Sequence, residues 1–321
     1  MAEVINQAHG KNWTLWHGDC VDVAKALPDD SLHYTIYSPP FQSLYTFSDD
    51  PRDMSNCADD ETFWQHYRFL IEEVTRATMP GRLISVHCMQ LPTSKTRDGF
   101  IGLRDFRGMI IRAHEDAGLI YHSEVCIRKD PVAAMQRTKA IGLLHKQIAK
   151  DSALSRMAVA DYIVTLRKLG DNPEPIAGGF DAYHGSDELP PEDPGGHAGH
   201  IASSYSVKVW QRYAEPVWMD INQSDVLSRN AARDQADERH ISPLQLTPIR
   251  RCLQLWSNPN DVVFSPFAGI GSELYCAVQM GRKALGAELK RSYFDQAVVN
   301  LREAERTTGA RDLFSSVEVA A

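Results

Sequence analysis

The sequence predicts an α/β fold in which crossover helices connect parallel strands. Short apolar runs alternate along the chain with segments whose apolar residues recur at helical spacing. Glycine or proline follows several of these helical segments, as is typical at the end of a helix. The 321 residues are 43% hydrophobic, which is enough for a full core. We therefore expect one large α/β domain, or one such domain with a sizeable insertion.

In the first half of the chain, expected strands alternate with expected helices. Apolar residues recur at helical spacing through Glu61–Thr78, and Met79-Pro80-Gly81 ends that helix. A basic, mostly helical block separates the last two strands of this half. In chain order we expect strand Thr14–Trp16, helix Cys20–Leu27, strand His33–Tyr37, helix Glu61–Thr78, strand Leu83–Cys88, helix Asp105–Ala117, and strands Ile120–Arg128 and Tyr162–Arg167.

The second half begins with a segment that has no periodicity. Asn172–His200 contains five Pro and six Gly, so we expect a flexible surface loop there. Regular alternation then resumes to the end of the chain. We expect strand Val207–Trp210, helix Pro243–Trp256, strand Asp261–Phe264, helix Ser272–Met280, strand Lys283–Gly286 reaching Glu288, and helix Ser292–Arg306.

Charge is distributed unevenly, although the formal net charge is only −8. Arg128–Lys168 contains nine Lys or Arg against three Asp, whereas Asp171–His200 contains seven acidic residues and no Lys or Arg. A basic block in an acidic protein indicates a surface for a polyanion. The alternative for this block alone is a solvated helical face.

The cysteines and the polar N-terminal residues favour a cytoplasmic protein. The six cysteines form no Cys-x-x-Cys pair and several lie in apolar runs, so we expect free thiols. Met1–Lys11 lacks the apolar core of a signal peptide, and no apolar run approaches the roughly 20 residues that span a bilayer.

A glycine turn follows one of the last expected strands. Phe267-Ala268-Gly269-Ile270-Gly271 connects strand Asp261–Phe264 to the helix that opens at Ser272. Glycine suits a position where the chain turns and a ligand approaches the backbone, and the helix behind the turn offers free N–H groups. An ordinary turn is the alternative, but a strand before it and a helix after it favour a nucleotide-type site.

Glu288 ends the next strand, seventeen residues after Gly271. An acidic residue in this position can accept hydrogen bonds from two ribose hydroxyls. No third glycine follows in register, which disfavours a dinucleotide and therefore a hydride-transfer enzyme. The pattern instead favours a nucleoside-like ligand without phosphates, such as S-adenosylmethionine. A solvated strand end is the alternative for Glu288.

The tetrapeptide Ser38-Pro39-Pro40-Phe41 follows strand His33–Tyr37. Two prolines fix the backbone and have no N–H, so their carbonyls can accept hydrogen bonds from an amino group. The Ser38 hydroxyl adds an acceptor, and the Phe41 ring offers a surface for a planar base. This arrangement suits methylation of an exocyclic amine, for which neither a Cys nucleophile nor a metal is needed. A plain proline turn is the alternative.

The two motifs together resemble the DNA amino-methyltransferases, which modify adenine N6 or cytosine N4. Members carry an Asp/Asn/Ser-Pro-Pro-aromatic motif and a Phe-x-Gly-x-Gly motif, here in the order of the permuted β class. The resemblance covers Trp13–Lys168 and Val207–Leu301. It implies a Rossmann-like, seven-stranded, mostly parallel sheet with helices on both faces and an inserted DNA-recognition region.

The resemblance also implies roles for particular residues. The catalytic set, which would hold a base flipped out of duplex DNA, is Ser38, Pro39, Pro40 and Phe41. Tyr45 and Phe47 are further candidates for lining the base slot, with a core position as the alternative. The cofactor set for S-adenosylmethionine is Asp19, Phe267, Ala268, Gly269, Gly271, Ser272 and Glu288. Ser in the first catalytic position favours cytosine over adenine, although the family does not divide cleanly on this residue.

Basic residues after the strands near the active edge are the candidates for DNA contacts. The phosphate-binding set is Arg97, Arg128, Lys129, Arg137, Lys139, Lys146 and Lys150, with His145 and Arg156 in the same block and Lys95, Arg104 and Arg107 beside Arg97. Gln136, Thr138 and Gln147 are candidates for base edges. Arg229–His240 is a second recognition element or, as we favour, a solvated helix.

These expectations divide the chain into five parts. They are a catalytic half (1–128), an inserted basic DNA-recognition segment (129–160), a return strand (161–170), a flexible Pro/Gly/acidic loop (171–206) and a cofactor-binding half (207–321). The stretches Arg97–Phe106 and Gln136–Ser155 are similar in general character to phage or prophage members of the family. The resemblance also implies a restriction-modification context, and the sequence leaves open whether a restriction enzyme accompanies the protein. Dimerisation is common in this class, so a homodimer is expected.

Two other functions remain open from the sequence. The same proline grip suits an amino group of RNA or a protein amide, although the basic insertion favours nucleic acid. A catalytically inactive DNA-binding homologue is the second alternative, and the intact motifs argue against it.

Overall fold

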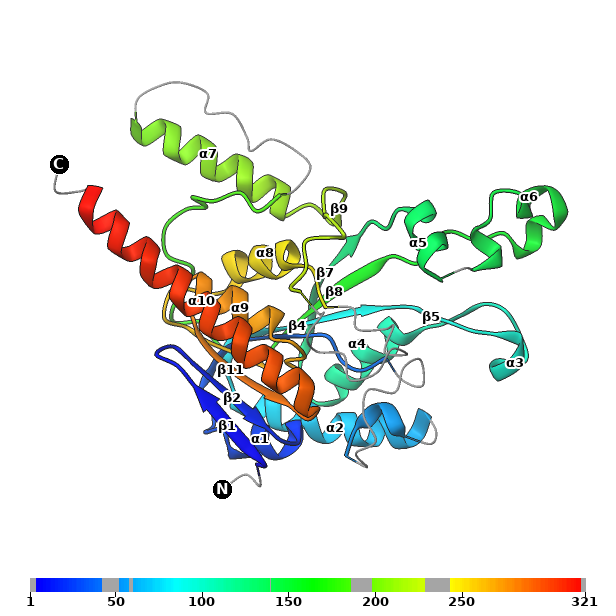
Figure 1. Cartoon of the computed structure of the whole chain (residues 1–321), viewed down its shortest axis with the longest axis horizontal. Helices are drawn as coiled ribbons and strands as arrows, with labels where there is room; N and C mark the ends of the chain where they lie inside the picture. The colour runs from blue at the N-terminus through cyan, green and yellow to red at the C-terminus, as the bar shows by residue number, and fades with distance from the viewer. Residues whose placement is uncertain are drawn as a thin grey trace.

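A computed structural model describes residues 4–41, 52–57, 60–138, 140–185, 198–228 and 243–318 (Figure 1). Its largest element is a nine-stranded sheet in the order β1-β2-β11-β10-β3-β4-β8-β7-β9. The strands are β1 Asn6–His9, β2 Trp13–His17, β3 Leu32–Tyr37, β4 Thr78–Met89, β7 Ile120–Ile127, β8 Asp161–Arg167, β9 Val217–Trp218, β10 Val262–Ser265 and β11 Lys283–Glu288. A separate two-stranded ribbon pairs β5 Leu91–Pro92 with β6 Leu103–Arg104.

The sheet confirms the expected mostly parallel architecture. The strands from β2 to β7 in the spatial order are seven, and β8 alone among them runs antiparallel to its neighbours β4 and β7. Two short strands extend this sheet at its edges: β1 pairs antiparallel with β2, and β9 adds two residues beside β7. These edge strands have no clear pattern in the sequence, because β1 is largely exposed and polar and β9 is only two residues long.

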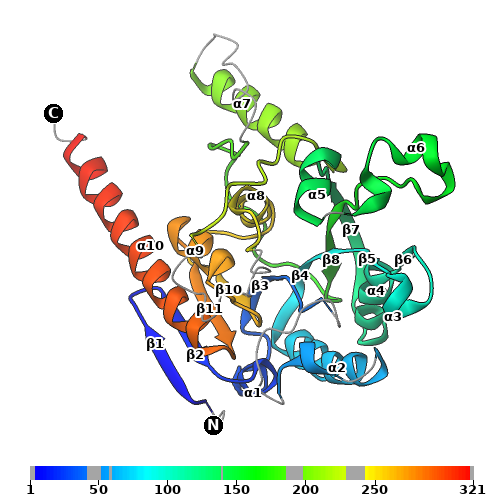
Figure 2. The same cartoon turned by 45° about the vertical axis from the view of Figure 1, so that its right-hand side comes forward.

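Helices cover both faces of the sheet (Figure 2). On one face α1 Cys20–Ala26, α2 Asp60–Ala77 and α4 Phe106–Asp116 bury apolar side chains such as Val23, Phe63 and Ile110. On the other face lie α8 Leu246–Trp256, α9 Ser272–Gln279 and α10 Arg291–Glu318. Successive strand residues alternate between the two layers, as Val263 and Phe264 do, because side chains on a strand point to opposite faces.

Most of the expected elements occur within a few residues of their expected bounds. One expectation is wrong. Val207–Trp210 is not a strand but part of α7 Ala198–Tyr213, so the expected loop 171–206 ends in a helix. The helix α2 ends at Ala77, one residue before its expected end, but β4 begins at Thr78 and so includes Pro80 and Gly81 before the expected strand start at Leu83. Arg229–His240, Tyr45, Phe47 and residues 186–197 of the loop lie outside the described residues.

Two arms extend from the same side of the molecule (Figure 1). One is the β5–β6 ribbon with α3 Lys95–Asp98 at its end. The other carries α5 Pro131–Thr138 and α6 Gln147–Lys150, between which lies a 3₁₀ turn, Ile141–Leu143. This second arm confirms the mostly helical content expected of the basic block. No helix in the described ranges combines the length and apolarity needed to cross a membrane.

The carboxyl ends of β2, β3, β10 and β11 meet at one edge of the sheet. Since β3 pairs directly with β10, the segment after Tyr37 lies next to the segment after Ser265. In open α/β sheets, ligands bind outside this edge. The topology therefore brings together two motifs that lie in opposite halves of the sequence.

Candidate functional site

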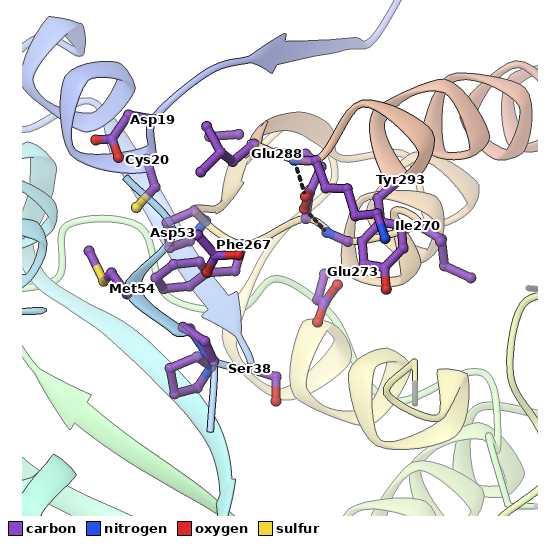
Figure 3. A pocket seen from close by; sticks show the side chains of 18 of the residues that line it. Asp19, Cys20, Ser38, Asp53, Met54, Phe267, Ile270, Glu273, Glu288 and Tyr293 are labelled. Carbon is purple, nitrogen blue, oxygen red and sulfur yellow. Dashed lines mark hydrogen bonds between the residues drawn. The ribbon is translucent and has the colours of Figure 1, made fainter. Parts of the chain in front are cut away.

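One cavity of about 190 Å³ lies at this edge of the sheet (Figure 3). The Ser-Pro-Pro-Phe tetrapeptide and the glycine turn both line it. Among the predicted catalytic and cofactor residues, those that line it are Ser38, Pro39, Pro40, Phe41, Asp19, Phe267, Ala268, Gly269, Ser272 and Glu288. The sequence therefore indicated most of this site, although its two halves come from opposite ends of the chain.

Glu288 connects the end of β11 to the glycine turn. Its Oε2 accepts a hydrogen bond from Gly269 N at 2.8 Å, and its Oε1 accepts one from Lys290 N at 2.8 Å. Burial raises the pKa of this carboxyl to about 7, and these two backbone donors oppose the rise. A carboxylate has about four acceptor positions, so Glu288 keeps acceptor capacity for a ligand with paired hydroxyls.

Asp19 lies at the start of α1, on the β2 side of the cavity. Its Oδ1 caps the helix by accepting from Val21 N at 2.8 Å and Asp22 N at 3.2 Å. Burial raises the pKa of the Asp19 carboxyl, and the capping hydrogen bonds oppose that rise. The cap fixes the carboxyl beside the cavity, and Oδ2 is the oxygen that remains for a ligand.

The two glycines of the turn have different positions. Gly269 has φ +54° and lines the cavity, and a Cβ there would meet nothing within 4 Å. Gly271 has φ +88° and begins α9, but it does not line the cavity; a Cβ there would lie 3.3 Å from Ala297 Cβ. Gly271 was predicted to contact the ligand, and the structure places it behind the turn, where it allows the left-handed backbone and the close packing of α10.

Ser272 supports the expectation of a polar ligand. Its side chain is 3% exposed and lines the cavity, yet its Oγ has no hydrogen-bond partner among the described residues. Buried hydroxyls are normally hydrogen-bonded, so a ligand donor or acceptor is needed there. Phe267 adds an apolar wall and packs on Tyr37 with ring centroids 5.8 Å apart. This set of groups fits a nucleoside with a free ribose.

The tetrapeptide forms the wall opposite Glu288. Pro39 is buried, while Ser38, Pro40 and Phe41 are half-buried. The Phe41 ring packs edge-on against Phe106 of α4, with centroids 6.1 Å apart, and so is held by the core beneath it. The Ser38 hydroxyl contacts Nδ1 of His87 at 2.9 Å.

Several lining residues were not identified from the sequence. Glu273, in the first turn of α9, is 4% exposed, and burial raises its pKa to about 8. The sequence did contain a signal for Glu273, since it is the one charged residue among Ser272–Gln279. Asp53 and Met54 reach the cavity from a short 3₁₀ turn that had no sequence signal. Lys290 lies over the Tyr293 ring at 4.5 Å on the far side.

The predicted DNA-binding residues fall into distinct groups. Arg128, His145, Lys146 and Lys150 are exposed on the helical arm or at its base, as are Gln136 and Thr138. Lys95 is exposed at the end of the other arm. The backbones of Arg97 and Arg137 lie in α3 and α5, and Lys139 lies outside the described residues.

Other predicted DNA contacts are used inside the protein. Lys129 Nζ lies 2.5 Å from Asp161 Oδ2 and donates to Gln223 Oε1 at 2.8 Å, so it serves the interior and not a phosphate. Gln147 is buried, with its amide on Asp151 O. Arg156 is half-buried, and Arg104 and Arg107 pair with Asp98 and Glu124, respectively. Sequence alone could not separate these from the exposed cations, because partners from other strands decide it.

One group of potential metal ligands lies at the opposite edge of the sheet. Donor atoms of His33, Glu174 and Asp261 lie within 4.8 Å of one another. The Arg82 guanidinium already contacts both carboxylates at 3.4 Å. This cation already pairs with both carboxylates, so the group is an ion-pair cluster.

Comparison with known proteins gives one extended match and several partial ones. A family model described as DNA methylase, for N6 and N4 methyltransferases, matches residues 32–299. The Type II methyltransferase M1.MboII of Moraxella bovis is 35% identical over 66 residues, which are 21% of this chain and 25% of that protein. The chain thus matches about a quarter of the length of the curated relatives.

Solved structures share the fold at low sequence identity. TTHA0409 of Thermus thermophilus, in complex with S-adenosyl-L-methionine, has a TM-score of 0.60 at 20% identity, covering 89% of this chain and 92% of that one. The cytosine-N4-specific PvuII DNA methyltransferase has a TM-score of 0.59 at 12% identity, covering 95% and 96%. These likenesses establish the architecture of the sheet and its helices.

Proposed function

The chain belongs to the DNA methylase family, and from this premise we propose that it is an S-adenosylmethionine-dependent DNA amino-methyltransferase. It transfers a methyl group to the exocyclic amino group of a base, either cytosine N4 or adenine N6. The observation that carries the proposal is the single cavity lined by both the amino-gripping tetrapeptide and the glycine turn with Glu288. Because both motifs line one cavity, the groups that accept hydrogen bonds from an amine lie beside the site for a nucleoside.

The side chains in the cofactor half of the cavity suit S-adenosylmethionine. Glu288 accepts hydrogen bonds from the ribose hydroxyls, Asp19 lies toward the adenine side, and Phe267 packs against an apolar face of the cofactor. Gly269 keeps the turn free of a side chain. When bound, the cofactor supplies an electrophilic methyl group on a positively charged sulfur. Two acidic side chains, Glu273 and Glu288, line the cavity, and a cationic ligand of this kind would favour their ionised forms.

The tetrapeptide half holds the amine that is to be methylated. The proline carbonyls and the Ser38 hydroxyl accept hydrogen bonds from the two amino hydrogens, which draws the nitrogen lone pair out of conjugation with the ring. Phe41 stacks on the base. In duplex DNA the amino group is inside the helix, so the base must be flipped out to reach this cavity. Ser38 in place of a carboxylate favours cytosine over adenine.

DNA lies across the side from which the two arms extend. The exposed cations of the helical arm, Lys146 and Lys150 among them, contact phosphates and position the duplex. In this division residues 1–128 hold the base, 129–160 contact DNA and 207–321 hold the cofactor, with α7 beginning before the last boundary at Ala198. A homodimer and a cytoplasmic location remain predictions from the sequence.

The test is mass spectrometry of nucleosides from the DNA of cells that express the protein. N4-methylcytosine or N6-methyladenine should appear with the wild type and be absent with Pro39→Ala, which removes the stiff turn but touches no cofactor group. Calorimetry should show the same affinity for S-adenosylmethionine in both proteins. Methylated RNA in place of DNA would redirect the assignment, and cofactor binding without any methylated product would indicate an inactive homologue.

A further inference from the structure

Behind Ser38 lies a line of polar side chains that leads away from the cavity. Ser38 Oγ is 2.9 Å from His87 Nδ1 and 3.3 Å from His87 O. On the other side of the ring, His87 Nε2 lies 3.1 Å from Asp161 Oδ2, within ion-pair distance but without the angle of a hydrogen bond. Lys129 Nζ lies 2.5 Å from the same carboxylate oxygen. The line thus runs from the cavity wall through β4 to the first residue of β8.

These groups are deeply placed. His87 is 8% exposed and Asp161 is 3% exposed, and neither lines the cavity itself. Burial would raise the pKa of Asp161, but the contacts with His87 and Lys129 outweigh it, and the pKa is lowered. A buried carboxylate beside Nε2 favours the imidazole tautomer with its proton on Nε2. Nδ1 is then the unprotonated nitrogen, and it faces the Ser38 hydroxyl.

This tautomer decides whether the Ser38 hydroxyl donates or accepts a hydrogen bond on the side of the target nucleobase. With Nδ1 as the acceptor, the Ser38 hydroxyl donates toward His87, and its lone pairs point to the cavity. A hydroxyl that turned its proton to the cavity would instead repel an amino hydrogen. His87 therefore prepares Ser38 to accept.

We propose that His87, held by Asp161, takes up through Ser38 the proton that the amine loses on methylation. The proposal rests on the proposed function. The amine nitrogen forms a bond to the methyl carbon as the carbon–sulfur bond breaks, with that electron pair staying on sulfur. The nitrogen, now positively charged, passes one proton to Ser38 Oγ, while the hydroxyl proton moves to His87 Nδ1. The imidazolium beside Asp161 later releases the proton to water, and all three residues return to their starting state.

Serine at this position makes such a partner necessary. A carboxylate at position 38 could hold the proton itself, but a hydroxyl cannot keep a second proton near neutral pH. The structure supplies a base for Ser38 at hydrogen-bond distance and an ionised group behind that base. The charged groups that it places around the His87 ring are Asp161 from β8 and, beyond it, Lys129. His87 is thus a positioning residue that acts through Ser38.

The first test reads the proton directly and needs no turnover. Nitrogen-15 NMR of the histidine side chains should show His87 as the Nε2–H tautomer in the cofactor-free protein. Asp161→Asn should weaken that preference. The Nδ1–H tautomer in the wild type would overturn the proposal, whether or not the protein methylates DNA. A wild type that methylates nothing would instead remove the proposed function.

The second test is single-turnover methylation at saturating cofactor with His87→Gln, which keeps a polar side chain but cannot take up a proton. The rate constant should fall about 100-fold, with little change in DNA or cofactor affinity. The matched control is His122→Gln, an exposed histidine on β7 bonded to Ser123, which should leave the rate unchanged.

A double variant separates proton uptake from simple packing. In a Ser38→Asp background the carboxylate takes the proton, so adding His87→Gln should cost only a few-fold. The same loss of about 100-fold in both backgrounds would overturn the proposal.

Discussion

Glu288 Oε2 accepts a hydrogen bond from Gly269 N at 2.8 Å and so joins the end of β11 to the turn after β10. The same carboxyl is bonded to Lys290 N through its other oxygen. The ionised carboxylate accepts from both donors, whereas a neutral carboxyl would carry a proton on one of these two oxygens. The shape of the cofactor half of the cavity is therefore tied to the protonation of one side chain.

The affinity for S-adenosylmethionine should depend on pH around neutrality. Burial raises the pKa of Glu288 to about 7, and ribose hydroxyls bind the ionised form. Lowering the pH below 7 should weaken binding, by at most about tenfold for each pH unit. Isothermal titration calorimetry from about pH 5.5 to about pH 8.5, a range on both sides of the pKa, measures the affinity.

The variant Glu288→Gln tests the same carboxylate without a change of pH. Its amide nitrogen would face one of the two backbone N–H groups, so binding should be weak at every pH. A wild type whose affinity is unchanged from pH 8 to pH 6 would contradict the role of this carboxylate in the ribose site.

Alanine substitutions at the two glycines of the turn should act by different routes. Gly269→Ala places a methyl group at the cavity wall, so it should weaken cofactor binding at least about tenfold; the positive φ costs stability on the order of 1 kcal/mol. Gly271→Ala combines φ +88° with a 3.3 Å approach to Ala297, so it should lower the melting temperature more and affect binding less. Thermal denaturation measures the loss of stability and calorimetry the loss of binding in both variants. Equal losses of both in the two variants would contradict the prediction.

Glu273 should destabilise the cofactor-free protein as the pH rises from 4.5 to about 8. Burial raises its pKa to about 8 from an ordinary value of 4.5, with the nearby Glu288 charge adding to the rise. The unfolded chain loses this proton near pH 4.5, whereas the folded protein holds it to about pH 8, so stability is lost as the pH rises between them. Glu273→Gln should raise the melting temperature at pH 8 and not at pH 4.5. A gain of equal size at both would argue for a packing effect.

Lys146→Ala and Lys150→Ala should weaken DNA binding without harm to the fold. Each lost phosphate contact lowers the slope of log affinity against log salt by about 0.9. Lys129→Ala should behave differently, because it leaves Asp161 buried without its cation and should cost on the order of 3 kcal/mol of folding stability. Fluorescence anisotropy over a salt series, with thermal denaturation beside it, distinguishes the two outcomes. An unchanged slope in both surface variants would remove the helical arm from the interface.

The sequence was informative where local chemistry decides the structure. Helical spacing, strand runs and the positions of Gly and Pro located most elements, and Glu288 could be placed at a strand end that lines the cavity. The error at Val207–Trp210 has a physical cause. Val207, Val209 and Trp210 are typical of strands, but they lie in a helix in which Val209 is buried while Val207 and Trp210 are exposed.

Contacts between distant segments were beyond the reach of the sequence. Nothing in the neighbourhood of His87 indicates that it lies behind Ser38, because β3 and β4 must first pair and β8 must bring Asp161 to the ring. The same holds for Lys129, whose charge suggested DNA until its partner on β8 was known. Pairing of charges across a sheet depends on register, which a single sequence does not reveal.

The neighbouring placement of β3 and β10 has a consequence for how the protein is made. Val262 N donates to His33 Nδ1 across 229 positions of the chain, and Tyr34 pairs with Val263. On the ribosome the amine grip emerges early, but the strand that completes its sheet follows on the order of ten seconds or more later. Until then one long edge of β3 is unpaired and open to association with other chains. A chain released before β10 is made would therefore lack the strand that brings the glycine turn beside Ser38.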